Sequence, residues 1–218
     1  MENEKSFDPW QSLLHVGWLA VLLGVTIEII LVMLAAGFGT LKSAHPVFAD
    51  LVNKISWSVI VCVGIAVGTM AQKARGPLMG LAGLLAAPLG FVVARSLHKG
   101  ALAALGVAAA AGPGPSLFLI GLLKGLQYGS FGLALSWIEK KPWGKLAAYL
   151  ATGLVAGLLF GGMIMALVIN AAPQMPPVPV LVASATNEFL FPIGCALVIY
   201  VSKVMKKARS SPDGSSGS

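Results

Sequence analysis

Three ionisable side chains lie inside long apolar stretches of the sequence: Glu28, Lys124 and Glu188. A charged side chain at the centre of a bilayer costs about 2.5–3.5 kcal/mol on insertion scales, so each of these residues is a candidate for a functional site. Because burial disfavours the charged form of a carboxyl, Glu28 or Glu188 can exchange protons near neutral pH. The amide side chains of Gln127 and Asn187 lie close to Lys124 and Glu188 in the sequence. These five residues form the predicted substrate-binding or ion-binding site.

The stretch that carries Glu188 also contains Pro192, four residues later. Proline has no N–H, so the carbonyl oxygen of Glu188 loses its normal helical partner. A carboxyl, the Asn187 amide and a freed carbonyl oxygen therefore occur together at membrane depth. Interrupted transporter helices form cation sites from such groups, and this favours a transport function.

The composition indicates a membrane protein. Of the 218 residues, 57% are hydrophobic and 11% are charged, whereas a soluble domain carries about 25% charged residues. We therefore predict an all-α, polytopic bundle of transmembrane helices in a lipid bilayer, as a single domain over residues 1–209. We expect it in a bacterial inner (plasma) membrane. The net charge of +7 is explained by lysines and arginines in loops on the cytoplasmic side, and we expect no binding to nucleic acid.

Apolar runs of about 20 residues predict membrane-spanning helices, and here seven are preferred over six. Gly112-Pro113-Gly114-Pro115 breaks any helix and separates a short helix from a full span. Merging residues 100–138 into one crossing gives the six-span alternative. The predicted spans cover residues 13–38, 55–71, 77–94, 101–111, 117–138, 145–169 and 180–204.

The distribution of Lys and Arg gives an orientation for each count. Seven spans place eleven of these residues on one side and three on the other, whereas six spans place ten and four. With seven, the N-terminus is outside and the C-terminus is cytoplasmic, and the uncharged loops at 112–115 and 170–179 share the outer face. With six, both ends are cytoplasmic.

The depths of the ionisable residues follow from the seven-span prediction. The first, fifth and seventh spans then run in the same direction, with Lys124 and Glu188 as the eighth and ninth residues of their spans. Both side chains would lie roughly 12 Å into the membrane, and we predict an ion pair between them. Glu28 would lie deeper, near Gln127. The alternative is that Lys124 and Glu188 are a structural pair that fixes the register of the helices.

Other polar residues receive simpler interpretations. Residues 40–53 are mixed in character, and Pro46 is expected to start a short helix on the membrane surface. Arg95 is expected to extend toward the membrane surface. The three histidines are interpreted as interfacial, and Cys62 and Cys195 as small core residues.

Two sets of glycines with four-residue spacing predict close helix packing. The preferred interpretation is contact within the chain, and the alternative is a homo-oligomer or a membrane partner subunit. The glycines are Gly121, Gly125 and Gly129 in one span and Gly153, Gly157 and Gly161 in the next.

The sequence has no metal-binding or catalytic motif, so we expect no cofactor, no metal site and no enzymatic activity. The leading hypothesis is a small transporter or channel for protons, cations or a small solute. The alternative is a non-catalytic subunit or scaffold of a larger complex. The tail at 210–218 is rich in Gly and Ser and is interpreted as a flexible, artificial addition.

Overall fold

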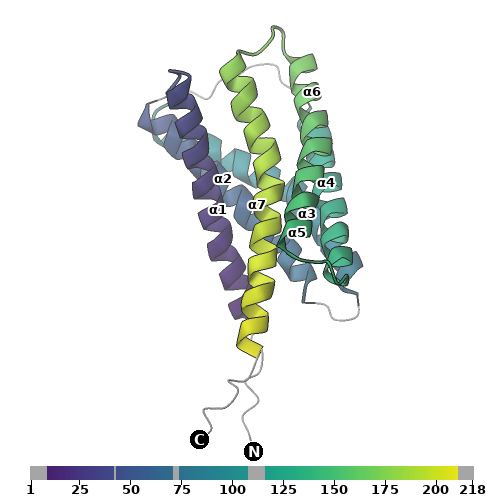
Figure 1. Ribbon diagram of the computed structural model, residues 1–218. Coiled ribbons are helices and arrows are strands. Elements are labelled where there is room, and N and C mark those ends of the chain that lie inside the picture. The colour runs from purple at the N-terminus through teal and green to yellow at the C-terminus, as the bar shows by residue number, and fades with distance from the viewer. Residues whose placement is uncertain (1–8, 42, 71–73, 108–115, 211–218) are drawn as a thin grey trace, which may run out of the picture.

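The computed structural model describes residues 9–41, 43–70, 74–107 and 116–210. All regular elements in these residues are helices, and six of them are long and apolar enough to cross a membrane. The chain is an integral membrane protein with an all-helical bundle (Figure 1). The helices are α1 (Pro9–Gly37), α2 (Ala44–Gly68), α3 (Arg75–Ala104), α4 (Leu117–Glu139), α5 (Leu146–Ala156) with η1 (Gly157–Gly161) and α6 (Gly162–Ala171), and α7 (Val178–Ser210).

The six-helix count, and not the preferred seven, is found in the described residues because α3 is longer than expected. The residues from Ala101 to Ala104, predicted to begin a separate short helix, complete α3 instead. Gly106 then ends this helix with a φ of 68°. Its N–H bonds to the carbonyl of Ala103, and the N–H of Val107 bonds to that of Leu102, which is a Schellman motif. The rest of the predicted short helix, at 108–111, lies outside the described residues, as does the tail at 211–218.

The first helix begins and the last helix ends at the same end of the bundle. The start of α1 and the end of α7 lie at the same end, at the bottom of Figure 1, as an even number of crossings requires. Arg75 pairs with Glu139 at this lower end, and Lys203 lies 3.8 Å from the same carboxylate. The seven-span prediction put Arg75 on the opposite side from Lys203. Because both side chains contact Glu139, both lie at one end of the bundle.

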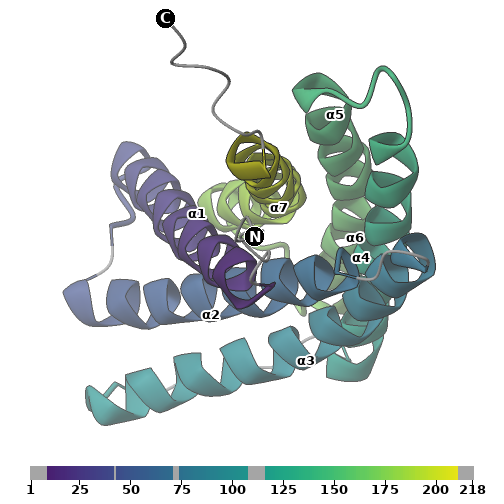
Figure 2. The ribbon, with the colours of Figure 1, turned by 90° about the horizontal axis from the view of Figure 1, so that it is seen from below.

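Each helix packs against the next, and α7 closes the bundle by packing on α1 and α5. Seen from below, α2 and α3 lie side by side and are strongly tilted relative to α1 and α7 (Figure 2). α2 begins at Ala44, so residues 44–53 belong to this long helix and do not form a separate surface helix. Two charged side chains from the first three turns of α2, Asp50 and Lys54, line the cavity described below.

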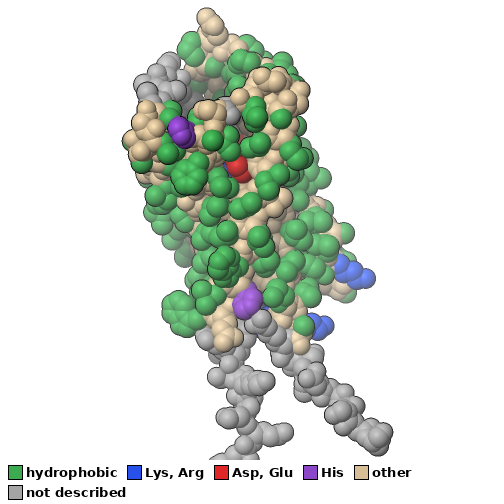
Figure 3. Space-filling view, turned by 90° about the vertical axis from the view of Figure 1, so that its left-hand side faces the viewer, with side chains coloured by type: hydrophobic (Ala, Val, Ile, Leu, Met, Phe, Trp, Pro, Cys, Tyr) green, Lys and Arg blue, Asp and Glu red, His purple; other side chains and the backbone are tan. Residues whose placement is uncertain are grey.

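The outer surface of α1 is apolar, as contact with lipid requires. Trp10, Trp18 and Leu22 are more than half exposed. Figure 3 shows that hydrophobic side chains cover most of this face and that Lys and Arg side chains gather near its lower end. An acidic side chain is visible in the upper half, surrounded by hydrophobic ones (Figure 3).

Both glycine sets contact other helices of the same chain. Gly125 and Gly129 lie against Leu84 of α3. Gly153 and Gly157 lie so close to the α7 backbone that a Cβ at Gly153 would approach the carbonyl oxygen of Pro192 to 2.6 Å. The contact within the chain predicted from the four-residue spacing is therefore found, although the two sets pack on different helices and not on one another.

Candidate functional site

A cavity of about 560 Å³ opens into the bundle from the end opposite the start of α1 and the end of α7. Its rim includes Thr40 and Leu41 after α1, and Pro177 and Pro179 around the start of α7. Its walls are mainly apolar, but six charged side chains line it as well. These are three carboxylates and three cations: Glu28, Asp50, Glu188, Lys54, Arg95 and Lys124.

The predicted ion pair between Lys124 and Glu188 is confirmed. The Lys124 ammonium donates a hydrogen bond to a carboxylate oxygen of Glu188, and the two side chains are only 7% and 12% exposed. The ammonium also lies 5.3 Å from the centre of the Trp57 ring, at the distance of a cation–π contact. Because α4 and α7 start at the same end of the bundle, Lys124 and Glu188 reach similar depths under either span count.

Glu28 lines the same cavity as Lys124 and Glu188, and the prediction that it lies deeper was wrong. With six helices, α1 runs in the opposite direction to α4 and α7, so Glu28, in the second half of the α1 sequence, is in the half of that helix nearer the cavity opening. Its side chain is only 6% exposed. The cavity thus brings together all three of the intramembrane charges found in the sequence.

The two predicted amides have different positions. Asn187 lines the cavity, and its buried Oδ1 has no hydrogen-bond partner among the described residues. Gln127 is fully buried and is not among the described residues that line the cavity. Its Nε2 donates a hydrogen bond to the carbonyl oxygen of Ala156 at 3.3 Å. Asn187 can therefore accept a hydrogen bond from a molecule in the cavity, whereas Gln127 connects α4 to α5.

Sequence reasoning missed three charged residues of the cavity: Asp50, Lys54 and Arg95. Asp50 and Lys54 are one helical turn apart on α2, in the region interpreted as a surface helix or its flank. Arg95 was assigned to the membrane surface. The four-residue spacing of Asp50 and Lys54 on a helix that enters the bundle could have identified them, since it puts both on one face.

Buried aromatic side chains pack in the core of the bundle below the ion pair. Trp57 makes edge-to-face contacts with Tyr128 and Phe191, with ring centres 5.7 and 6.4 Å apart. Tyr128 is one turn beyond Lys124, and Phe191 is about one turn beyond Glu188. One turn further, the free thiols of Cys62 and Cys195 lie 3.1 Å apart in the buried core. None of these aromatic and thiol side chains is among the described residues that line the cavity.

The helix backbones beside Glu188 depart from regular α geometry. Between α5 and α6 the chain forms the π-helical turn η1, a feature that often occurs at functional sites. A Cβ on Gly161 of this turn would lie 3.1 Å from the Cβ of Glu188. The carbonyl oxygen of Glu188, which Pro192 leaves without its usual partner, lies 3.5 Å from the Cβ position of Gly157. That oxygen therefore faces the neighbouring helix, and not a cation site in the cavity.

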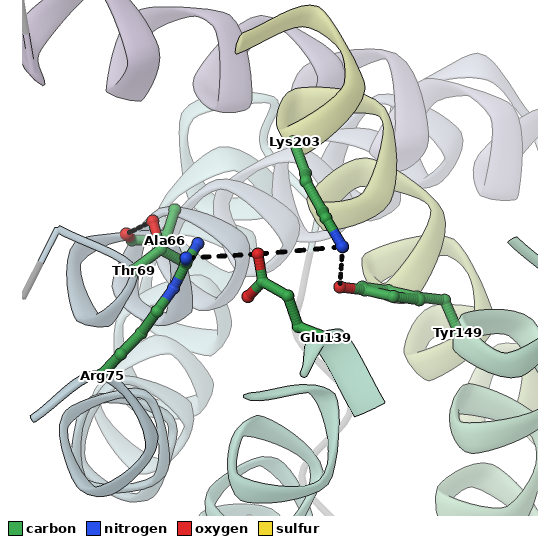
Figure 4. A network of polar contacts seen from close by, with 6 residues as sticks. All are labelled: Ala66, Thr69, Arg75, Glu139, Tyr149 and Lys203. Carbon is green, nitrogen blue, oxygen red and sulfur yellow. Dashed lines mark hydrogen bonds and ion pairs between the residues drawn. The ribbon is translucent and has the colours of Figure 1, made fainter. Parts of the chain in front are cut away.

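A second polar cluster lies at the lower end of the bundle (Figure 4). Glu139 at the end of α4 accepts contacts from Arg75 of α3 at 3.2 Å and from Lys203 of α7 at 3.8 Å. The Lys203 ammonium is also 3.5 Å from the Tyr149 hydroxyl of α5. Four helices are therefore joined by one carboxylate and its neighbours at the end of the bundle opposite the cavity.

Comparison with known proteins gives no relative for this chain. No family model, no curated protein and no solved structure matches it.

Proposed function

We propose that the protein is a small transporter that moves protons, cations or a small solute across the membrane. Its binding site contains Glu28, Lys124, Glu188 and Asn187. The observation that carries the proposal is the cavity, which reaches these side chains at membrane depth from one end of the bundle. Ionisable residues that face a cavity inside a membrane protein are typical of substrate and ion pathways.

A transporter fits the site better than an open channel. Below the ion pair, the buried aromatic side chains around Trp57 pack in the core of the bundle. At the opposite end, the contacts of Glu139 with Arg75 and Lys203 hold α3, α4 and α7 together. A substrate that enters the cavity can leave at the other side only after these contacts rearrange, which is the alternating access of secondary transporters.

Glu28 is the best candidate for exchanging a proton or a cation with the substrate pathway. Its buried carboxyl lines the cavity, and it takes no part in the Lys124–Glu188 pair that joins α4 to α7. The unsatisfied acceptor of Asn187 adds a position for a hydrogen-bond donor, such as water or a hydroxyl group on a solute.

The orientation follows from the basic residues in the loops. In the six-span count from the sequence, ten Lys and Arg residues are on the side of both chain ends and four are on the other side. The positive-inside rule then puts both termini in the cytoplasm. In this orientation the cavity opens to the outside, and the Glu139 cluster faces the cytoplasm.

The alternative function, a non-catalytic subunit or scaffold, depended on glycine faces available to a partner. The glycines of both sets contact α3 or α7 within the chain. A homo-oligomer or partner subunit that uses these faces would have to displace those contacts.

Proton flux into proteoliposomes tests the transport proposal. Wild-type protein is reconstituted with the pH-sensitive dye pyranine inside the vesicles, and a pH gradient is imposed in the presence of valinomycin and potassium. Glu28→Gln is expected to lower the flux by about tenfold or more, equivalent to about 1.4 kcal/mol in the barrier. This change removes the carboxyl without breaking the Lys124–Glu188 pair.

Ser130→Ala is the matched control for that experiment. The Ser130 hydroxyl bonds only to carbonyls of its own helix, Leu126 and Gln127, on the exposed side of α4. Flux through this variant should equal that of the wild type. A wild-type flux no greater than that of empty vesicles would count against proton transport, and equal flux through Glu28→Gln would remove Glu28 from the mechanism.

A further inference from the structure

The charges in the cavity are not all neutralised by one another. Lys124 is paired with Glu188. Asp50 lies 3.5 Å from the imidazole of His98, one turn above Arg95 on α3. The side chains of Lys54 and Arg95 make no ion pair and no hydrogen bond with any residue that the structure describes, although both line the cavity.

These two cations come from neighbouring helices. Lys54 is on α2 and Arg95 is on α3, and the two helices pack closely along their length. A guanidinium binds carboxylate, sulfonate or phosphate groups with two parallel hydrogen bonds, and an ammonium adds a point charge. Lys54 is half-buried at the cavity wall, where an ammonium attracts an anion more strongly than it would on a hydrated surface, and the exposed Arg95 is accessible to an entering anion.

Apolar side chains line the same cavity as the two cations. Phe91 is one turn from Arg95 on α3, Ile120 is one turn from Lys124 on α4, and Ile164 and Met165 come from α6. A cavity of about 560 Å³ is large enough for a small organic molecule. The cavity can therefore hold a molecule with a charged end and an apolar body.

We infer that the cavity binds a small organic anion, with its anionic group on Lys54 and Arg95 and its apolar body against α3, α4 and α6. This inference deepens the proposed function by naming a substrate class, and it depends on that function for its role in transport. The same chemistry is offered by a dissolved organic acid and by the head group of an anionic lipid.

Three probes of similar size and fixed charge test the inference with the full-length protein in nanodiscs of phosphatidylcholine. They are benzenesulfonate (an anion), benzenesulfonamide (neutral) and benzyltrimethylammonium (a cation), and binding is measured by isothermal titration calorimetry. Benzenesulfonate should bind most tightly. Arg95→Gln and Lys54→Gln should each weaken its binding about tenfold, equivalent to about 1.4 kcal/mol.

Lys99→Gln is the matched control, because Lys99 is an exposed cation on α3 that is not among the described residues of the cavity wall. Its affinity for benzenesulfonate should equal that of the wild type. Elution volume and helical circular dichroism establish that each variant is folded. Tighter binding of benzyltrimethylammonium, or unchanged benzenesulfonate binding in folded Arg95→Gln and Lys54→Gln, would overturn the inference.

A second set of nanodiscs distinguishes the two sources of the anion. If phosphatidylglycerol in the nanodisc abolishes benzenesulfonate binding, the lipid head group occupies the same cations, and if binding persists, a dissolved anion is the ligand. Both results support an anion site. The inference and the transport proposal fail separately, because benzenesulfonate binding does not require proton flux and the Glu28→Gln flux experiment contains no organic anion.

Discussion

The same two helices, α4 and α7, are joined by ionic contacts at both ends of the bundle. Lys124 of α4 pairs with Glu188 of α7 beside the cavity. Fifteen residues later on both helices, Glu139 of α4 lies 3.8 Å from Lys203 of α7. The cation is on α4 in the upper contact and on α7 in the lower contact. The two contacts are about 22 Å apart along the helix axes.

The two contacts differ most in their surroundings. The upper pair is 7% and 12% exposed and lies against the ring of Trp57. The lower side chains are 33% and 16% exposed, and Glu139 shares its charge with Arg75. Separating a buried pair leaves uncompensated charges in an apolar interior, whereas separated charges near water are hydrated. Opening the lower end of the bundle therefore costs less free energy than separating α4 from α7 at the cavity.

The largest expected effect comes from removing one partner of the upper pair. Lys124→Met leaves the Glu188 carboxylate buried without its cation, and should lower the free energy of unfolding in detergent by about 3–5 kcal/mol. The double variant Lys124→Met/Glu188→Leu should be close to the wild type in stability, because no buried charge remains. Equal losses in the single and double variants would show that packing, and not charge, stabilises this contact.

A smaller effect is expected from crowding the helix beside the upper pair. A methyl group at Gly161 would meet Glu188 and the Phe189 ring at 3.1–3.2 Å. Gly161→Ala should therefore cost about 1–3 kcal/mol of unfolding free energy, measured in the same detergent. The adjacent Gly162→Ala is the matched control, because nothing lies within 4 Å of its added methyl group. If both variants behave alike, the close approach of η1 to α7 contributes nothing to the stability of the upper pair.

The smallest effect is expected at the lower end. Glu139→Gln removes the charge that Arg75 and Lys203 share, and should cost about 1 kcal/mol or less, because these side chains are partly hydrated. Lys203→Gln should cost less again, since its contact is 3.8 Å long. Both values come from thermal unfolding of the purified variants. A loss at Glu139 as large as that at Lys124 would contradict the idea that burial separates the two ends.

The sequence predicted the helical membrane fold and the ion pair between Lys124 and Glu188. That pairing did not depend on the number of spans, because α4 and α7 run in the same direction in both counts. The position of Glu28 did depend on it. An even number of crossings reverses α1, and so moves Glu28 from its expected deep position to the cavity.

The remaining site residues depended on contacts that a linear pattern does not contain. Lys54 and Arg95 have the sequence surroundings of interfacial residues, and only the tilt of α2 and α3 brings them to the cavity wall. The end of α3 was also misjudged. Gly106 is one of many glycines in a stretch of small residues, and nothing in that stretch indicated that Gly106 would adopt a positive φ. Tertiary packing decided the first outcome, whereas the local Schellman motif at Gly106 decided the second.

The π-helical turn η1 has a consequence for the sequence itself. A π turn contains one more residue than the α turn that would replace it, so the segment from Gly157 to Gly161 acts as an insertion in an otherwise regular helix. Deleting one residue there would restore α geometry and rotate everything that follows by about 100° relative to α5. Ile164, Met165 and Val168 would then turn away from the cavity that they line. One residue of chain length thus sets which face of α6 meets the site.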